Sequence, residues 1–423
     1  MLAVLVAASA LALWRLPPFH PAQLWCLPWT LAGVLYTAHL LPYRWVSGRT
    51  ALLVIASTIA FVGCSLAGER LFSRLAGRVH LEDEREYRHA IRLAAVTATA
   101  LVAVLLLAFV AQVAGDFGLR AALVSSQDVR GAIGEGAYSV TVKYLYFALA
   151  AIVLCSLAAA QAETRRSAIA WLLVAIVLAG TIYFSTGRST IVVGLIAGSV
   201  AYILGSRRRI SQLQFLGGFA AVTVLALAAL VGGGHLIGKT WANNGFIRAV
   251  PSVFHEHRVL NELALPYQYA SANIAALDVQ VDAASTWGAT GGCAALVEAC
   301  RALARLGVDV EIVPRVRQFT ADPLPWNTYT ALDVPLLDGG LALTVPIIAC
   351  VGLLVGLLWG VAQHRSILGI GAYAIVAPAI ITAYGQFNFT APHLVGGTLI
   401  ACLAVLAARL PMRNEAPSTA PSA

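Results

Sequence analysis

The chain has 423 residues, of which 59% are hydrophobic and only 11% carry a charged side chain. A mean hydropathy of +0.80 leaves too few polar side chains to cover a soluble protein of 44.4 kDa. The formal net charge is +8, but the basic residues are spread over segment ends rather than gathered with aromatic residues, which argues against nucleic-acid binding. The composition therefore predicts an integral membrane protein embedded in a lipid bilayer.

Eleven apolar segments are candidates for membrane-spanning helices, because a span needs about 20 mainly apolar residues. Ten come near this length: 22–41, 51–68, 92–114, 142–162, 168–184, 189–205, 213–232, 341–361, 366–384 and 393–409. The eleventh, 1–14, is short, and we interpret it as a tilted first helix, with a re-entrant or interfacial segment as the alternative.

The predicted fold is thus an all-α polytopic membrane protein with about 11 transmembrane helices. Residues 1–232 hold spans one to eight and 340–410 hold spans nine to eleven. Between them, 233–339 form one large loop of mixed polarity, and 411–423 read as a disordered tail.

Orientation follows from Lys and Arg in the short loops, since cytoplasmic loops carry the excess of these residues. The pair Arg165-Arg166 and the run 207–209 lie two spans apart, and both the basic 69–91 stretch and the C-terminal tail agree with them. We therefore expect the C-terminus in the cytoplasm and the 233–339 loop outside.

The large loop has predicted elements of its own. Residues 262–278 read as a helix, 291–306 as a second helix with Gly307 as its C-cap, and 308–313 alternate as a strand. The loop is therefore predicted to be helical with a small helix-strand insert.

Cys293 and Cys300 share this loop. An uninterrupted helix would hold their Cα atoms about 10 Å apart, beyond the roughly 7 Å that a disulfide allows. A disulfide requires the helix to begin after Cys293, and both alternatives remain open.

Candidate binding residues begin with Arg188, in a small-residue turn between two apolar spans. An arginine at such a depth normally faces a partner or a polar cavity, or else reaches the outer headgroups. If Arg188 faces a polar cavity, we expect it to bind a phosphate-like anion, because the planar guanidinium group matches two phosphate oxygens at once. Arg248, Glu256, His257 and Arg258 follow the eighth span, either as a solvated loop edge or as a cationic pocket shared with Arg188.

Polar residues also gather at the end of the loop. Asn327 and Tyr329 precede Asp338 at the entry to the next span, a placement that suits contacts to sugar hydroxyls and a general base. Tyr267 is expected at the membrane interface.

Three motifs make this chain resemble the Wzy-type O-antigen or oligosaccharide repeat unit polymerases, which are polytopic proteins of the bacterial inner membrane. They are the Ser-Thr-Gly-Arg-Ser turn at 185–189, the segment 269–277, and Asn-Thr-Tyr-Thr at 327–330 followed by Leu-Asp-Gly-Gly at 337–340. The related O-antigen ligases carry a histidine directly before the asparagine, where this chain has Trp326.

The resemblance implies a glycosyltransferase that polymerises undecaprenyl-pyrophosphate-linked oligosaccharides on the periplasmic face, for lipopolysaccharide or a related surface polysaccharide. Arg188, Arg248 and Arg258 would hold the departing pyrophosphate, and Asp338, Glu256 and His257 are candidates for the catalytic base. Asn327, Tyr329 and Tyr267 would bind the substrate. We expect no metal, because many metal-dependent membrane glycosyltransferases keep an acidic residue in their first outer loop and 42–50 has none here. We also expect no cofactor.

Other functions stay open. In an O-antigen ligase, His255 or His257 would stand in for the missing histidine. A transporter or flippase of a lipid-linked or anionic substrate is disfavoured, because no internal repeat is visible and the spans are almost free of interior charge. A noncatalytic assembly role is a third alternative, and a chain-length regulator is a partner that the sequence leaves open.

Overall fold

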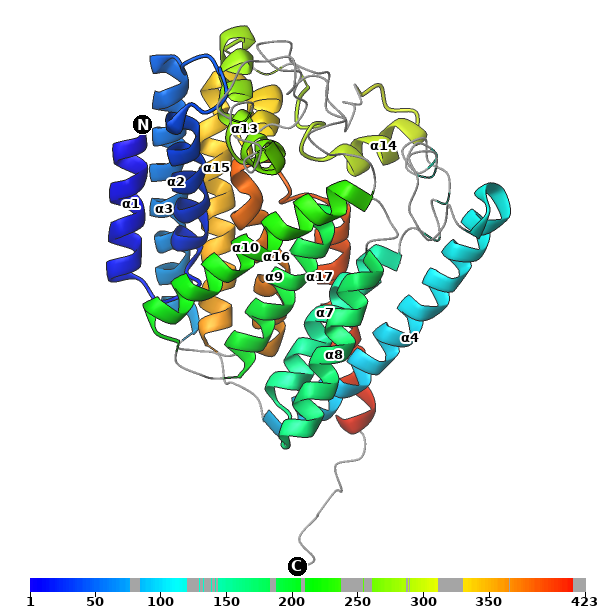
Figure 1. Cartoon of the computed structure of the whole chain (residues 1–423). Helices are drawn as coiled ribbons and strands as arrows, with labels where there is room; N and C mark the ends of the chain where they lie inside the picture. Colours follow the sequence, from blue (N-terminus) through cyan, green and yellow to red (C-terminus); the bar gives the residue numbers. More distant parts are fainter. Residues whose placement is uncertain are drawn as a thin grey trace, which may run out of the picture. The chain divides into compact units, whose positions relative to one another are not determined.

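The computed structural model (Figure 1) describes residues 1–76, 84–119, 129, 132, 138, 141, 144–182, 188–206, 210–236, 254, 261–286, 288, 290–310, 330–364 and 366–413. Only the backbone is described at 75–76, 84–87, 188–190, 225–226, 229–230, 232–236, 298, 392 and 409–413. Regular structure in the described ranges is helical, which confirms the all-α fold.

The α-helices follow the predicted apolar segments closely. They are α1 (Leu2–Arg15), α2 (Pro21–Ala38), α3 (Gly48–Ala76), α4 (Glu84–Phe117), α7 (Tyr144–Ala160), α8 (Arg165–Thr181), α9 (Arg188–Gly205), α10 (Gln212–Leu236), α13 (Ala264–Ala283), α14 (Val297–Arg305), α15 (Asp333–Gln363), α16 (Ile367–Ile381) and α17 (Pro392–Arg413), with short 3₁₀ turns η4 (Asn261–Leu263) and η5 (Thr382–Tyr384). Each of the eleven predicted segments coincides with one of these helices.

Four helical stretches in the described part of the chain are long and apolar enough to cross a membrane. They are Gly48–Arg74, Arg88–Phe117, Asp333–Gln363 and Ile367–Tyr384. Five further helices are apolar but shorter. The fold is therefore that of a helical protein with membrane-spanning candidates, while eleven crossings, the sidedness and the periplasmic loop stay predictions.

The structure departs from two expectations in the large loop. The helix predicted over 291–306 begins only at Val297, because Gly291 and Gly292 adopt positive φ values of 56° and 100°, outside the helical region. Val308 to Val310 form no strand, and 311–313 lie outside the described residues. The predicted end of this helix is confirmed, since Gly307 has a φ of 85° and its N–H donates to the Ala304 carbonyl.

The chain divides into two compact units that interleave along the sequence. Unit 1 comprises 1–74, 209–360 and 377–391, and unit 2 comprises 75–208, 361–376 and 392–423.

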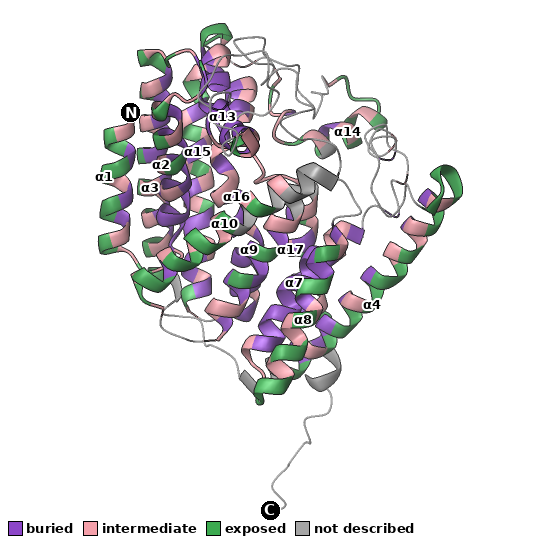
Figure 2. Cartoon of the chain, in the orientation of Figure 1, coloured by how far each residue is buried: buried purple, intermediate pink, exposed green. Residues whose placement is uncertain are grey.

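Unit 2 is built around α7. This helix contacts α4, α8, α9 and α17, and Figure 2 shows it buried along most of its length. Its buried residues, such as Tyr144, Ile152 and Leu154, belong to one apolar cluster with Phe109 of α4. A helix that is apolar on all sides is expected at the centre of such a bundle.

Unit 1 contains a close pairing of α3 with α15. A Cβ atom at Gly352 would lie only 2.6 Å from the Phe61 carbonyl oxygen, and one at Gly356 would collide with the Ser65 carbonyl. Gly360 repeats the contact one turn further on, against Phe72. Glycines four residues apart let two backbones approach closely, as in helix pairs within membranes. The contacts advance in the same direction along both helices, so α3 and α15 run parallel.

Candidate functional site

The parallel pairing brings two polar segments to the same end of unit 1. Gly48 begins α3, 13 residues before Phe61, and Gly340 lies 12 residues before its partner Gly352. At 1.5 Å per residue, both positions lie roughly 18 to 20 Å from this shared contact and are therefore level with each other. The segment that precedes α3 and the first turns of α15 together form the candidate site.

Helix α15 is interrupted at Gly340, which has a φ of 62° and a ψ of −165°. This region of backbone conformation is essentially restricted to glycine. The break frees the N–H groups of Leu341 and Ala342, which donate to the carbonyls of Ser285 and Thr286. The segment that follows α13 is thereby attached to α15.

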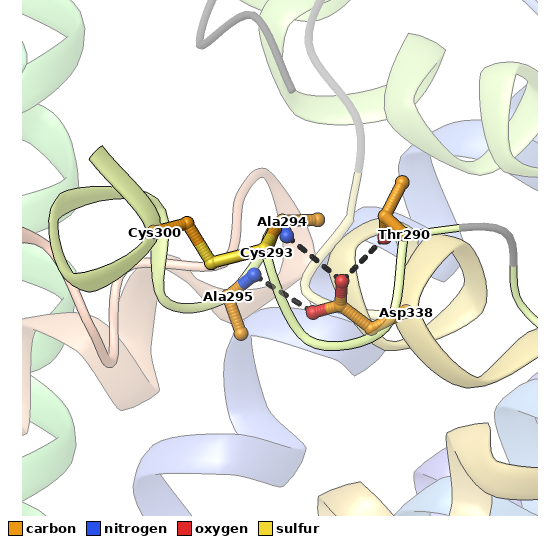
Figure 3. Close-up of a disulfide and its surroundings, with 6 residues drawn as sticks. All are labelled: Thr290, Cys293, Ala294, Ala295, Cys300 and Asp338. Atoms are coloured by element: carbon orange, nitrogen blue, oxygen red, sulfur yellow. Dashed lines mark hydrogen bonds between the residues drawn. A yellow bond between two sulfur atoms is a disulfide. The ribbon is translucent and has the colours of Figure 1, made fainter. Parts of the chain in front are cut away.

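Asp338, two residues before the break, binds a loop that we define as residues 290–296, the Asp338 loop. Its Oδ1 accepts hydrogen bonds from the Thr290 hydroxyl and from Ala294 N–H at 2.8 Å, and its Oδ2 accepts one from Ala295 N–H at 2.7 Å (Figure 3). Both carboxylate oxygens are occupied by the protein itself. The predicted base is thus engaged in holding the loop.

A disulfide closes the same loop. Cys293 and Cys300 are bonded, with their Cα atoms 5.7 Å apart, because α14 begins after Cys293 (Figure 3). Of the two alternatives that the sequence left open, the structure has the disulfide. It lies directly beside the two backbone amides that bind Asp338.

A second carboxylate, Asp278 of α13, lies at the start of α3 and is fully buried. Its Oδ1 accepts three hydrogen bonds, from the Thr50 hydroxyl at 2.6 Å and from the N–H and hydroxyl of Ser47 at 2.8 Å each. Its Oδ2 forms an ion pair with Arg44 Nε at 2.8 Å. Ser47 caps α3, since its hydroxyl accepts from Thr50 N–H, so Asp278 places its charge at a helix N-terminus, where negative charge is favoured.

The environment of Asp278 sets its protonation. Burial, the largest single influence, raises its pKa, but the hydrogen bonds from Thr50 and Ser47 and the charge of Arg44 together lower the pKa below its ordinary value. Asp278 is therefore ionised at neutral pH. Arg44 is also paired with Asp282, so its charge is shared between two carboxylates.

Tyr267, predicted to bind substrate, is only 6% exposed. Its hydroxyl donates to the Leu35 carbonyl at 2.6 Å and accepts from Leu40 N–H at 2.9 Å, across the end of α2. Burial is the main influence that raises its pKa. The structure thus uses the side chain to join α13 to α2 and leaves little of it open to a substrate.

Most of the other predicted site residues fall outside the described residues: Arg248, Glu256, His257, Arg258, Asn327 and Tyr329. Arg188 is the first residue of α9, in unit 2, but its side chain is not among those described. Their predicted roles stay predictions.

One group of polar residues at this site was not predicted from the sequence: Arg44, Ser47, Thr50 and Asp278. The available signal was the acidic residue Asp278 at the end of a predicted helix, since a carboxylate needs a partner once it is buried. Among the described residues, no three His, Cys, Asp or Glu side chains gather as a metal site requires.

Comparison of the whole chain with protein-family models, with curated proteins and with solved structures finds no match to any of the three.

Proposed function

We propose that this protein is a membrane glycosyltransferase that polymerises undecaprenyl-pyrophosphate-linked oligosaccharide repeat units on the periplasmic face of a bacterial inner membrane. The supporting observation is the Leu-Asp-Gly-Gly segment that carries the family resemblance. In it, Asp338 and the break at Gly340 attach the Asp338 loop and the segment after α13 to a long apolar helix. This arrangement suits chemistry on a substrate whose lipid lies in the bilayer and whose sugars lie outside.

In the proposed reaction, the bond between the anomeric carbon and the pyrophosphate oxygen breaks, and the pyrophosphate leaves with the electron pair. The hydroxyl of the acceptor repeat forms the new glycosidic bond and gives its proton to a base. Arginines balance the charge that develops on the pyrophosphate, and Arg188, Arg248 and Arg258 are proposed for this role.

The hydrogen bonds to Asp338 favour a positioning role for this residue, because three of its four lone-pair sites are taken. Glu256 and His257 are then the stronger candidates for the base.

The test is a comparison of Arg188→Ala with Arg165→Ala, an exposed arginine at the start of α8. Each variant replaces the wild-type protein in cells, after its level in the membrane has been checked. We expect Arg188→Ala to lower polymer by about 100-fold or more, with single repeats on the surface lipid, and Arg165→Ala to leave polymer unchanged.

Whole polymer left on the lipid carrier would indicate a ligase instead. Repeats retained on the cytoplasmic face would indicate a transporter, and an unchanged glycan profile would rule out the proposed role of Arg188. Arg188→Lys adds a sharper comparison, since lysine keeps the charge but lacks the bidentate fork.

A further inference from the structure

One aromatic side chain at the candidate site is exposed while its neighbours are buried. Trp45 lies in the connector between α2 and α3, residues 39–47, and is 62% exposed. Tyr36, which packs beside Trp45, and Tyr43, which stacks on Tyr36, are at most 4% exposed. Trp45 is therefore the accessible member of a group of packed aromatic side chains.

The backbone on both sides of Trp45 is held in place. The Tyr36 hydroxyl donates to the Arg44 carbonyl at 2.5 Å and accepts from Val46 N–H at 2.8 Å. These two hydrogen bonds fix the peptide groups that flank Trp45. Tyr36 also meets the indole edge to face, with ring centroids 6.1 Å apart.

One face of the Trp45 ring is covered by His39. The two rings stack with centroids 4.2 Å apart and an angle of only 3° between their planes. His39 ends α2 in the left-handed conformation, with a φ of 53° and a ψ of 36°. This conformation is unfavourable for a residue that has a Cβ atom.

The same histidine has a second unfavourable feature. Its Nδ1 is buried and has no hydrogen-bond partner among the described residues. Backbone strain and an unsatisfied polar atom at one residue are typical of functional sites, where the geometry matters more than stability. Here the stacked His39 and the two hydrogen bonds of Tyr36 hold the Trp45 indole in place, with one face covered and the other open.

We propose that the open face of Trp45 is a stacking platform for one sugar ring of the oligosaccharide substrate. The platform rests on the proposed function and assigns to it a binding subsite for the saccharide part of the substrate. A pyranose presents an apolar face of C–H groups that matches an aromatic ring, while its hydroxyls stay hydrated at the edge. Trp45 lies three residues before α3, on the level of the break in α15, where the sugars of a lipid-linked substrate would lie.

The competing explanation is an interfacial tryptophan that contacts lipid headgroups. Such an anchor requires neither the two hydrogen bonds of Tyr36 nor the strained histidine, since a mobile ring partitions into the interface equally well. Trp14 of α1, 74% exposed, supplies a matched control, because its ring contacts Arg15 instead of a fixed aromatic partner.

The experiment measures binding of the oligosaccharide released by mild acid from the lipid-linked pool of the host cell, using purified full-length protein in nanodiscs. Saturation-transfer NMR gives the contacts and the Kd for the wild type, Trp45→Ala, Trp45→Phe and Trp14→Ala. We expect Trp45→Ala to weaken binding about 3- to 10-fold, Trp45→Phe to retain most of it and Trp14→Ala to change nothing. His39→Gly, which suits the left-handed backbone and keeps the chain folded, should also weaken binding.

A Kd for Trp45→Ala equal to that of the wild type overturns the platform. That result would leave Trp45 with the role of an interfacial lipid anchor. Polymerisation assays separate the two proposals. If Arg188→Ala loses polymer but Trp45→Ala binds the saccharide as the wild type does, only the platform is rejected. If the saccharide binds at Trp45 but the protein does not polymerise it, only the proposed reaction is rejected.

Discussion

Asp278 and Asp338 lie at the same end of unit 1 but are held in different ways. Asp278 is fully buried, and its partners include the side chains of Ser47, Thr50 and Arg44. Asp338 is bound mainly by backbone amides of one disulfide-closed loop. The first arrangement depends on the identity of each partner, whereas the second depends on the shape of the loop and tolerates most changes of its side chains.

The largest expected effect comes from removing the buried charge. Asp278→Ala leaves Arg44 and two hydroxyls without their carboxylate, and we expect the free energy of unfolding to fall by about 3 to 5 kcal/mol. Thermal unfolding in detergent measures this loss. Asp282→Ala removes the other, half-exposed partner of Arg44 and should cost no more than about 1 kcal/mol. Equal losses in both variants would mean that the buried position of Asp278 is unimportant.

A smaller effect is expected from opening the loop. The Cys293→Ser, Cys300→Ser double variant removes a bridge over a short loop, worth about 2.5 kcal/mol by the chain-entropy relation. Amide hydrogen exchange at Ala294 and Ala295 should accelerate, because their N–H groups no longer face Asp338 in a fixed geometry. Cys64→Ser, at a free cysteine of α3, is the control. Unchanged exchange would show that Asp338 holds the loop without the disulfide.

The smallest effect is the pH dependence of the Asp278 cluster. The pKa of Asp278 is lower in the folded protein than in the unfolded chain, so its stabilising contribution is present above the unfolded value of about 3.9 and is lost as the pH falls further. The difference in Tm between wild type and Asp278→Asn should stay constant from about pH 5 to 7 and narrow below about pH 4. A difference that widens in acid would contradict the lowered pKa.

Apolar runs were enough to predict the helices, because a long apolar stretch has few ways to satisfy its backbone in a membrane. All eleven segments are helical, and α1 is one of the shorter apolar helices, so its crossing of the membrane stays a prediction. The predicted start of α14 at residue 291 was wrong, because Gly291 and Gly292 adopt positive φ values and Cys293 is bonded to Cys300. Of the predicted strand 308–313, residues 308–310 form no strand and 311–313 lie outside the described residues.

The candidate site was less predictable, because its contacts join residues far apart in the chain. Asp338 lies just before the break in α15, and its partners at 290–295 could not be read from spacing. Asp278 and Arg44 are more than 200 residues apart, and no local pattern connects them. Trp45 and His39 are near neighbours, yet their stacking depends on a left-handed residue that composition does not reveal.

The pairing of α3 with α15 also has a consequence for biosynthesis. Phe61 and Gly352 are about 290 residues apart, so at roughly 5 to 20 residues per second α15 leaves the ribosome about 15 to 60 s after α3. During that interval the Phe61 and Ser65 face of α3 lacks the glycines that it finally meets. The membrane insertion machinery must therefore keep the N-terminal helices apart from wrong partners until nearly the whole chain has been translated.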